Sequence, residues 1–262
     1  MFVDESVVHQ ISEQLYNAEK DRRVVAALTD RYPGIQLEKA YEIQLENVNR
    51  KKAMGDPVVG HKIGLTSKAM QRMLGVQEPD FGHLFASMSY HSGDVVDYPF
   101  IQPKVEPELA FVLQDNLEGP NIGIEDVLRA TRFVVPAVEV IDSRITDWKI
   151  KLADTIADNA SSGCFVLGDS VQAIAGTNIL TAGAVLKING EVVETGAGAA
   201  VMGNPAVAVA WLANKLSSLG TTLRSGDIIL SGAVSAAVPV NPGDYVSLSF
   251  GHLGRVEFTL QC

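Results

Sequence analysis

The stretch "QPKVEPELAFVLQ", residues 102–114, places two glutamates at the head of an apolar run. The run predicts a buried β-strand over residues 108–113, and side chains two residues apart in a strand point to the same face. Glu106 and Glu108 would then lie roughly 7 Å apart on one face, at about 3.3 Å of rise per residue. Charged side chains are costly in apolar surroundings unless a partner neutralises them, so this pair indicates a partner.

A third glutamate has equally apolar neighbours, because Glu139 lies in "VVPAVEVIDS", residues 134–143. Three carboxylates held in strands, with few arginines nearby, offer the oxygen ligands that a hard divalent cation such as Mg²⁺ or Mn²⁺ prefers. The alternatives are a solvent-exposed strand face, or glutamates paired with lysine or arginine. The spacing of the glutamates leaves these alternatives open.

Short apolar runs separated by Gly, Pro and Asp predict further strands along the chain. They lie at residues 58–65, 132–141, 163–169, 183–196, 227–232 and 244–260. Asn189-Gly190 between two alternating runs predicts a hairpin turn. Helices are predicted at residues 123–131 and 204–220, the second one capped by Asn204 with Pro205 at its first position. Many strands with few helices predict a mixed, β-rich α+β fold.

Helical periodicity dominates the N-terminal part of the chain. Residues 4–20 and 37–54 both repeat apolar side chains at helical spacing, and Gly55-Asp56-Pro57 ends the second helix. We therefore expect an N-terminal helical part, residues 1–56, followed by a catalytic β-rich domain, residues 57–262. The helices could equally form one layer of the same domain.

The composition excludes several classes of protein. A net charge of −10 disfavours nucleic-acid binding, which normally needs a basic face. Two cysteines without CxxC spacing, Cys164 and Cys262, do not indicate a disulfide scaffold. The N-terminus lacks an apolar signal core, and the longest apolar stretch is broken by Gly203-Asn204-Pro205. We therefore expect a cytoplasmic protein with no membrane span.

Two further stretches combine polar and apolar residues. "GHKIGLTSKAMQRMLGVQEPDFG", residues 60–82, contains Lys62 in a predicted strand and Asp80 in a predicted turn. A buried lysine loses its charge easily and can act as an acid or base beside a carboxylate, although a surface strand end and a turn are the simpler explanation. "DTIADNASSG", residues 154–163, has small hydroxyls and amides that suit a carboxylate or keto oxygen, or an ordinary Asx/Ser turn.

Taken together and in this order, these stretches resemble the fumarylacetoacetate hydrolase superfamily. Within it they are similar to the branch of hydratases and decarboxylases that act on 2-oxo and 2-hydroxy dienoic acids from catechol meta-cleavage. The resemblance covers nearly the whole chain and includes three further segments. These are "VVPAVEVIDSRITDWKIKLADTIADNASSG", "NGEVVETGAGAAVMGNPAVAVAWLANKL" and "ILSGAVSAAVPVNPGD".

The resemblance implies a distorted β-barrel-like core with an N-terminal helical part, assembled as a homo-oligomer, and allows for a partner enzyme of the same pathway. It implies metal ligands, a proton-transfer pair and two substrate-binding positions. These are Glu106, Glu108 and Glu139 for Mg²⁺ or Mn²⁺, Lys62 and Asp80 for proton transfer, and the Leu65 backbone and Ser161 for the substrate carboxylate. Because Ser162 adjoins Ser161, the register of that turn decides which hydroxyl faces the pocket.

The implied reaction is hydration of 2-hydroxypenta-2,4-dienoate to 4-hydroxy-2-oxopentanoate. Two alternatives share its metal–enolate chemistry, namely decarboxylation of 4-oxalocrotonate and hydration of a longer dicarboxylic homologue such as 2-oxohept-3-enedioate. A metal-free binding module of the same fold would lack at least one of the three glutamates, and all three are present. The sequence leaves open which of Lys62 and Asp80 is the acid in each step.

Overall fold

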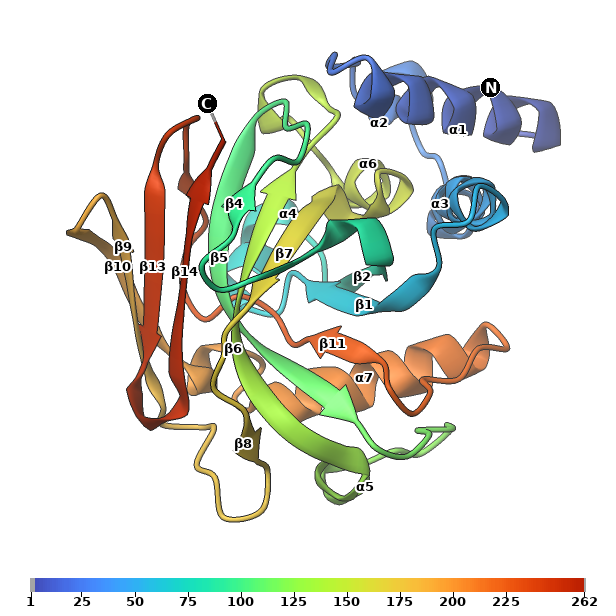
Figure 1. Ribbon diagram of the computed structural model, residues 1–262. Coiled ribbons are helices and arrows are strands. Elements are labelled where there is room, and N and C mark those ends of the chain that lie inside the picture. The colour runs from blue at the N-terminus through green and yellow to red at the C-terminus, as the bar shows by residue number, and fades with distance from the viewer. Residues whose placement is uncertain (1–2, 262) are drawn as a thin grey trace.

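The computed structural model describes residues 3–261, which form two β-sheets and seven α-helices (Figure 1). The larger sheet has the strand order β2-β1-β11-β5-β6-β7-β3, with β12 paired to β5 and β8 paired to β6. Its strands are β1 (Val58–Gly64), β2 (Asp80–Phe85), β3 (Ser89–His91), β5 (Pro103–Leu113), β6 (Thr131–Asp142), β7 (Ser162–Leu167), β8 (Gln172–Ala173), β11 (Ile228–Leu230) and β12 (Val238–Pro239). The sheet curls into a half-barrel around the long, bent strands β5 and β6 (Figure 1). The predicted β-rich, barrel-like α+β fold is confirmed.

The smaller sheet packs beside β6 and has the order β10-β9-β13-β14-β4. Its strands are β4 (Val95–Val96), β9 (Gly183–Ile188), β10 (Glu191–Ala197), β13 (Tyr245–Phe250) and β14 (Gly254–Leu260). The predicted hairpin between β9 and β10 is confirmed, since Asn189 and Gly190 both have the positive φ that a type I′ turn requires.

The prediction of one strand over residues 244–260 is wrong. A 3₁₀ turn at Gly251–Leu253 reverses the chain, and β13 and β14 pair in antiparallel orientation. The reversal buries Val246 and Leu248 of β13 together with Val256 and Phe258 of β14. An apolar alternation that continues on both sides of a short turn does not reveal that the chain reverses there.

The helices are α1 (Glu5–Lys20), α2 (Leu28–Arg31), α3 (Leu37–Ala53), α4 (Lys68–Leu74), α5 (Ile124–Ala130), α6 (Leu152–Ala157) and α7 (Pro205–Ser218). The four predicted helices are confirmed, and two have side-chain caps. Asp4 accepts a hydrogen bond from the Val7 amide at α1, and Asn204 accepts one from the Ala206 amide at α7. Helices α2, α4 and α6, of four to seven residues, were not predicted.

The N-terminal helices pack against the β-rich part rather than standing apart. Ile11 of α1 and Ile43 of α3 belong to the same hydrophobic cluster as the strands. The buried Gln44 side chain of α3 donates to the carbonyls of Phe81 in β2 and Ile156 in α6. The helical layer thus packs on β2 and is hydrogen-bonded to it. The division of the chain at residue 56 stays a prediction. No helix within residues 3–261 is long and apolar enough to cross a membrane.

Candidate active site

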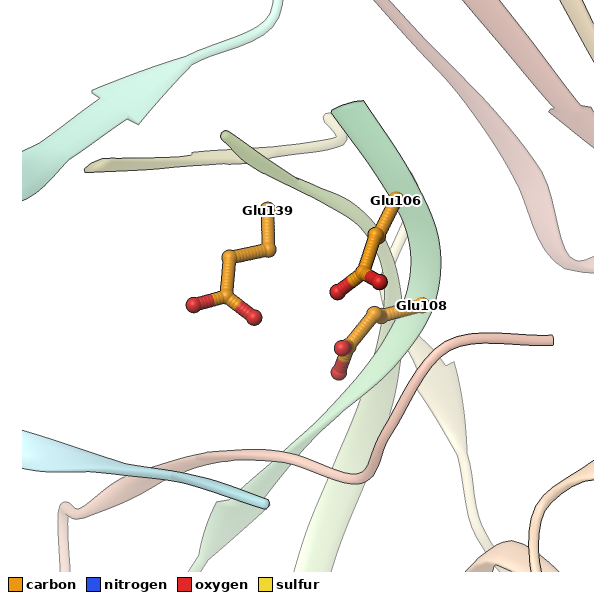
Figure 2. Close-up of side chains that lie close together, drawn as sticks. All are labelled: Glu106, Glu108 and Glu139. Carbon is orange, nitrogen blue, oxygen red and sulfur yellow. The ribbon is translucent and has the colours of Figure 1, made fainter. Parts of the chain in front are cut away.

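Three carboxylates meet on one face of the large sheet (Figure 2). Glu106 and Glu108 lie on β5, and the antiparallel register places Glu139 of β6 directly opposite Glu106. Each glutamate offers one carboxylate oxygen within 4.8 Å of the others. The side chains of Glu108 and Glu139 are buried and Glu106 is half-buried. The alternative of a solvent-exposed strand face is excluded for Glu108 and Glu139.

Burial and the proximity of like charges raise the pKa of these three carboxyl groups. Burial raises the pKa of Glu106 to about 7, although Lys62 opposes the rise. The pKa of Glu108 rises well above its usual range because of burial and the charges of Glu139 and Glu106. Burial also raises the pKa of Glu139, whose Oε2 has no hydrogen-bond partner among the described residues. Positive charge at this position would therefore stabilise the ionised cluster.

The cluster fits a hard divalent cation. All of its donors are carboxylate oxygens, which Mg²⁺ and Mn²⁺ prefer. Two oxygens bound to one Mg²⁺ at about 2.1 Å lie at most about 4.2 Å apart, so small side-chain rotations would bring all three onto one ion. Glu108 is already oriented, since its Oε2 accepts a hydrogen bond of 2.8 Å from the Gly232 amide. Gly232 has a φ of +112°, and a Cβ there would collide with Thr66.

Lys62 and Asp80 lie on neighbouring strands of the same sheet. Lys62 pairs with Gly82 across β1–β2 and Asp80 pairs with Gly64, so their side chains are diagonal neighbours on one face. The prediction of a turn at Asp80 is wrong, because Asp80 is the first residue of β2 and is buried. A surface strand end is likewise excluded for Lys62, which is only 3% exposed.

The charges around Lys62 decide its protonation. Burial by itself lowers the pKa of Lys62, but the charges of Glu139 and Asp80 outweigh it and the pKa is raised. The Lys62 Nζ donates to the Ala160 carbonyl at 2.9 Å and lies 3.3 Å from Oε1 of Glu139. Burial raises the pKa of Asp80, and the charge of Lys62 and the hydroxyl of Thr155 oppose the rise.

A left-handed turn after α6 faces Lys62 and Glu139. Asn159, Ala160 and Ser161 have φ values of 52°, 51° and 52°. This conformation costs roughly 1–2 kcal/mol per residue for side chains with a Cβ, so other contacts must hold the turn. Ser162 Oγ donates to Glu139 Oε1 at 3.3 Å, whereas Ser161 Oγ lies 3.4 Å from Thr155 Oγ1. Ser162 thus contacts the acidic cluster, and a substrate-binding role for Ser161 stays a prediction.

Leu65 directly follows β1 and also has a left-handed backbone, with a φ of 57°. Its carbonyl accepts a hydrogen bond of 2.9 Å from Gln71 Nε2. A carboxylate only accepts hydrogen bonds, so the backbone group that Leu65 can offer to a substrate carboxylate is its amide N–H. Its binding role stays a prediction.

A sequence profile described as fumarylacetoacetate (FAA) hydrolase C-terminal matches residues 58–261. The chain belongs to the fumarylacetoacetate hydrolase family. It is 42% identical to a 2-hydroxyhexa-2,4-dienoate hydratase from Comamonas testosteroni, over 98% of this chain and 99% of that protein. It is 44% identical to a 2-keto-4-pentenoate hydratase from Paraburkholderia xenovorans, over 95% of this chain and 93% of that protein. A solved structure of 4-oxalocrotonate decarboxylase from Pseudomonas putida G7, complexed with magnesium and adipate, is 39% identical over 99% of both chains with a TM-score of 0.96.

Some residues at the site of this fumarylacetoacetate hydrolase family member were not found from its sequence. Arg144 and Gly232 contribute through contacts with other segments of the chain. Asn159 had a signal, since it lies in the 154–163 stretch whose amides suit a substrate oxygen, but its contact with His83 was not predicted. The Ala160 contribution is a backbone carbonyl, which an alanine in the sequence does not signal. The sequence does indicate Ser162, because it adjoins Ser161 and the register of the turn decides which of the two hydroxyls faces the pocket.

Proposed function

We propose that this protein is a divalent-cation-dependent hydratase that converts 2-hydroxypenta-2,4-dienoate to 4-hydroxy-2-oxopentanoate. The observation that carries the proposal is the glutamate cluster with Lys62 on the same buried site. An all-oxygen metal site next to proton-carrying groups suits a 2-oxo acid, whose carboxylate and 2-oxygen form a chelate. Near-full-length relatives named as dienoate hydratases support this reaction class.

Glu106, Glu108 and Glu139 would hold Mg²⁺ or Mn²⁺. When bound, the cation supplies Lewis-acid stabilisation of the negative charge that develops on the substrate oxygens. Ketonisation of the dienol removes the 2-hydroxyl proton and adds a proton at C5. Hydration then adds hydroxide at C4 and a proton at C3. Each step needs a group that gives or takes a proton near the substrate.

Lys62 and Asp80 are the titratable groups that we assign to these transfers. The raised pKa of Lys62 keeps it as an ammonium, a donor of hydrogen bonds and protons. Asp80 is buried on the same face as Lys62 and has a raised pKa, so it can accept and return a proton. The Leu65 amide and Ser161 would hold the substrate carboxylate, and the chain would assemble as a homo-oligomer larger than a dimer.

Decarboxylation of 4-oxalocrotonate is the second candidate. It is favoured by the similarity to the solved decarboxylase over 99% of both chains. A product assay that offers the monocarboxylic dienol and 4-oxalocrotonate with Mg²⁺ or Mn²⁺ distinguishes the two candidates. Formation of 4-hydroxy-2-oxopentanoate from the dienol supports the hydratase. Release of CO₂ from 4-oxalocrotonate without hydration of the dienol would refute it in favour of the decarboxylase.

A further inference from the structure

One side chain ties the left-handed turn to strand β2. Asn159 Oδ1 accepts a hydrogen bond of 2.8 Å from the His83 amide, and Asn159 Nδ2 donates one of 2.9 Å to the His83 carbonyl. The neighbouring Gly82 lets the two backbones touch, since a Cβ at Gly82 would collide with the Asn159 carbonyl. The turn is therefore docked directly on the strand that carries Asp80.

A buried arginine holds the two ends of the same turn. Arg144 Nη2 donates to the Asp158 carbonyl at 2.6 Å, and Nη1 donates to the Ser162 carbonyl at 2.8 Å. Arg144 Nε donates to the Asp158 carboxylate at 2.6 Å. The rigid, planar fork of donors in a guanidinium is preorganised to span two fixed carbonyls in this way. The left-handed residues Asn159 to Ser161 lie between these anchors.

The turn presents the Ala160 carbonyl to Lys62. An ammonium has three N–H donors. One bonds the Ala160 carbonyl at 2.9 Å and a second can point to Glu139 Oε1 at 3.3 Å. This arrangement leaves one donor for a substrate. If the turn relaxed, the flexible lysine side chain could turn its ammonium entirely toward the carboxylates.

We propose that Asn159 and Arg144 are positioning residues, which hold the strained turn so that the Ala160 carbonyl aims the Lys62 ammonium at the substrate. The inference rests on the proposed function, because it assumes that Lys62 takes part in the reaction. A displacement of about 1 Å in a reacting group lowers turnover by about 10²-fold. The turn therefore controls turnover, while the three glutamates control cation binding.

The chain provides a matched control for Asn159. Asn214 brackets the backbone of Ile122 with the same two hydrogen bonds, both 2.9 Å, at a position outside the site. Asn159→Ala and Asn214→Ala each remove one such pair of bonds. Steady-state rates on the dienol give kcat and KM, and calorimetric titration with Mn²⁺ counts the intact sites per chain.

We expect Asn159→Ala to lower kcat at least about tenfold per Mn²⁺ site, with KM changed less than about twofold. Asn214→Ala should keep the native kcat. Asn159→Gly loses the same bonds but accepts the left-handed backbone, so it decides the question if the alanine variant does not fold. Native kcat per site in the folded Asn159 variant would overturn the inference. A native chain that turns over neither substrate would instead refute the proposed function, and the inference with it.

Discussion

Two buried histidines each contribute a loss of stability as the pH falls. His61 and His83 face each other across β1 and β2, with ring centroids 4.8 Å apart and with 5% and 7% of each residue exposed. Neither Nδ1 has a hydrogen-bond partner among the described residues. Burial lowers the pKa of His83 to about 4 and lowers the pKa of His61 well below its usual value. Both rings are therefore neutral at pH 7.

The sign and size of the effect follow from proton linkage. A histidine with a depressed pKa in the folded state adds stability that is complete above its unfolded pKa, about 6.5. That stability is lost as the pH falls toward the folded value. At about 1.4 kcal/mol per pKa unit, His83 alone lowers the free energy of unfolding by about 2 kcal/mol between pH 8 and pH 5. His61 acts in the same direction.

Urea unfolding at pH 8 and pH 5 measures this loss in the native chain and in His83→Gln. Buried carboxyl groups act in the opposite direction over this pH range. Burial raises the pKa of Asp158 to about 6, for example. The informative quantity is therefore the difference between the native chain and the variant in the free energy lost from pH 8 to pH 5. His83→Gln should reduce the loss by about 2 kcal/mol, and exposed His252→Gln should leave it unchanged. Equal losses in the native chain and His83→Gln would refute the reasoning.

Four further predictions concern the site and the assembly. Glu108→Gln should fold but lower Mn²⁺ affinity at least about tenfold, since an amide is a poorer ligand for a hard cation; full activity of this variant with a chelator present would contradict the metal site. Lys62→Ala and Asp80→Asn should lower turnover by about 10² or more and leave Mn²⁺ affinity nearly unchanged by calorimetry; loss of metal binding would move that residue among the ligands. Gly232→Ala should destabilise the fold by about 1–3 kcal/mol in urea, because its Cβ meets Thr66 at a positive φ, and native stability would show that the loop yields freely. Sedimentation should show a homo-oligomer larger than a dimer, and a monomer mass at micromolar concentration would rule it out.

Local sequence determined the features that depend on neighbouring residues. The strand alternation around Glu106 and Glu108 placed both carboxylates on one face, because a strand has a period of two. Asn189-Gly190 predicted a hairpin because both positions tolerate a positive φ. The resemblance to the family, spread over most of the chain, added the assignments of Lys62 and Asp80 that local patterns did not support.

Tertiary structure decided what depends on segments distant in the chain. The register of β5 against β6 brings Glu139 opposite Glu106, and local alternation cannot specify which residues of two strands meet. The same holds for Asp80, which pairing with β1 converts from an expected turn residue into a buried strand residue. The raised pKa of Lys62 follows from carboxylates on other strands. The turn around Asn159 exists because contacts with β2 and Arg144 offset the strain of its left-handed backbone, and no local pattern encodes such contacts.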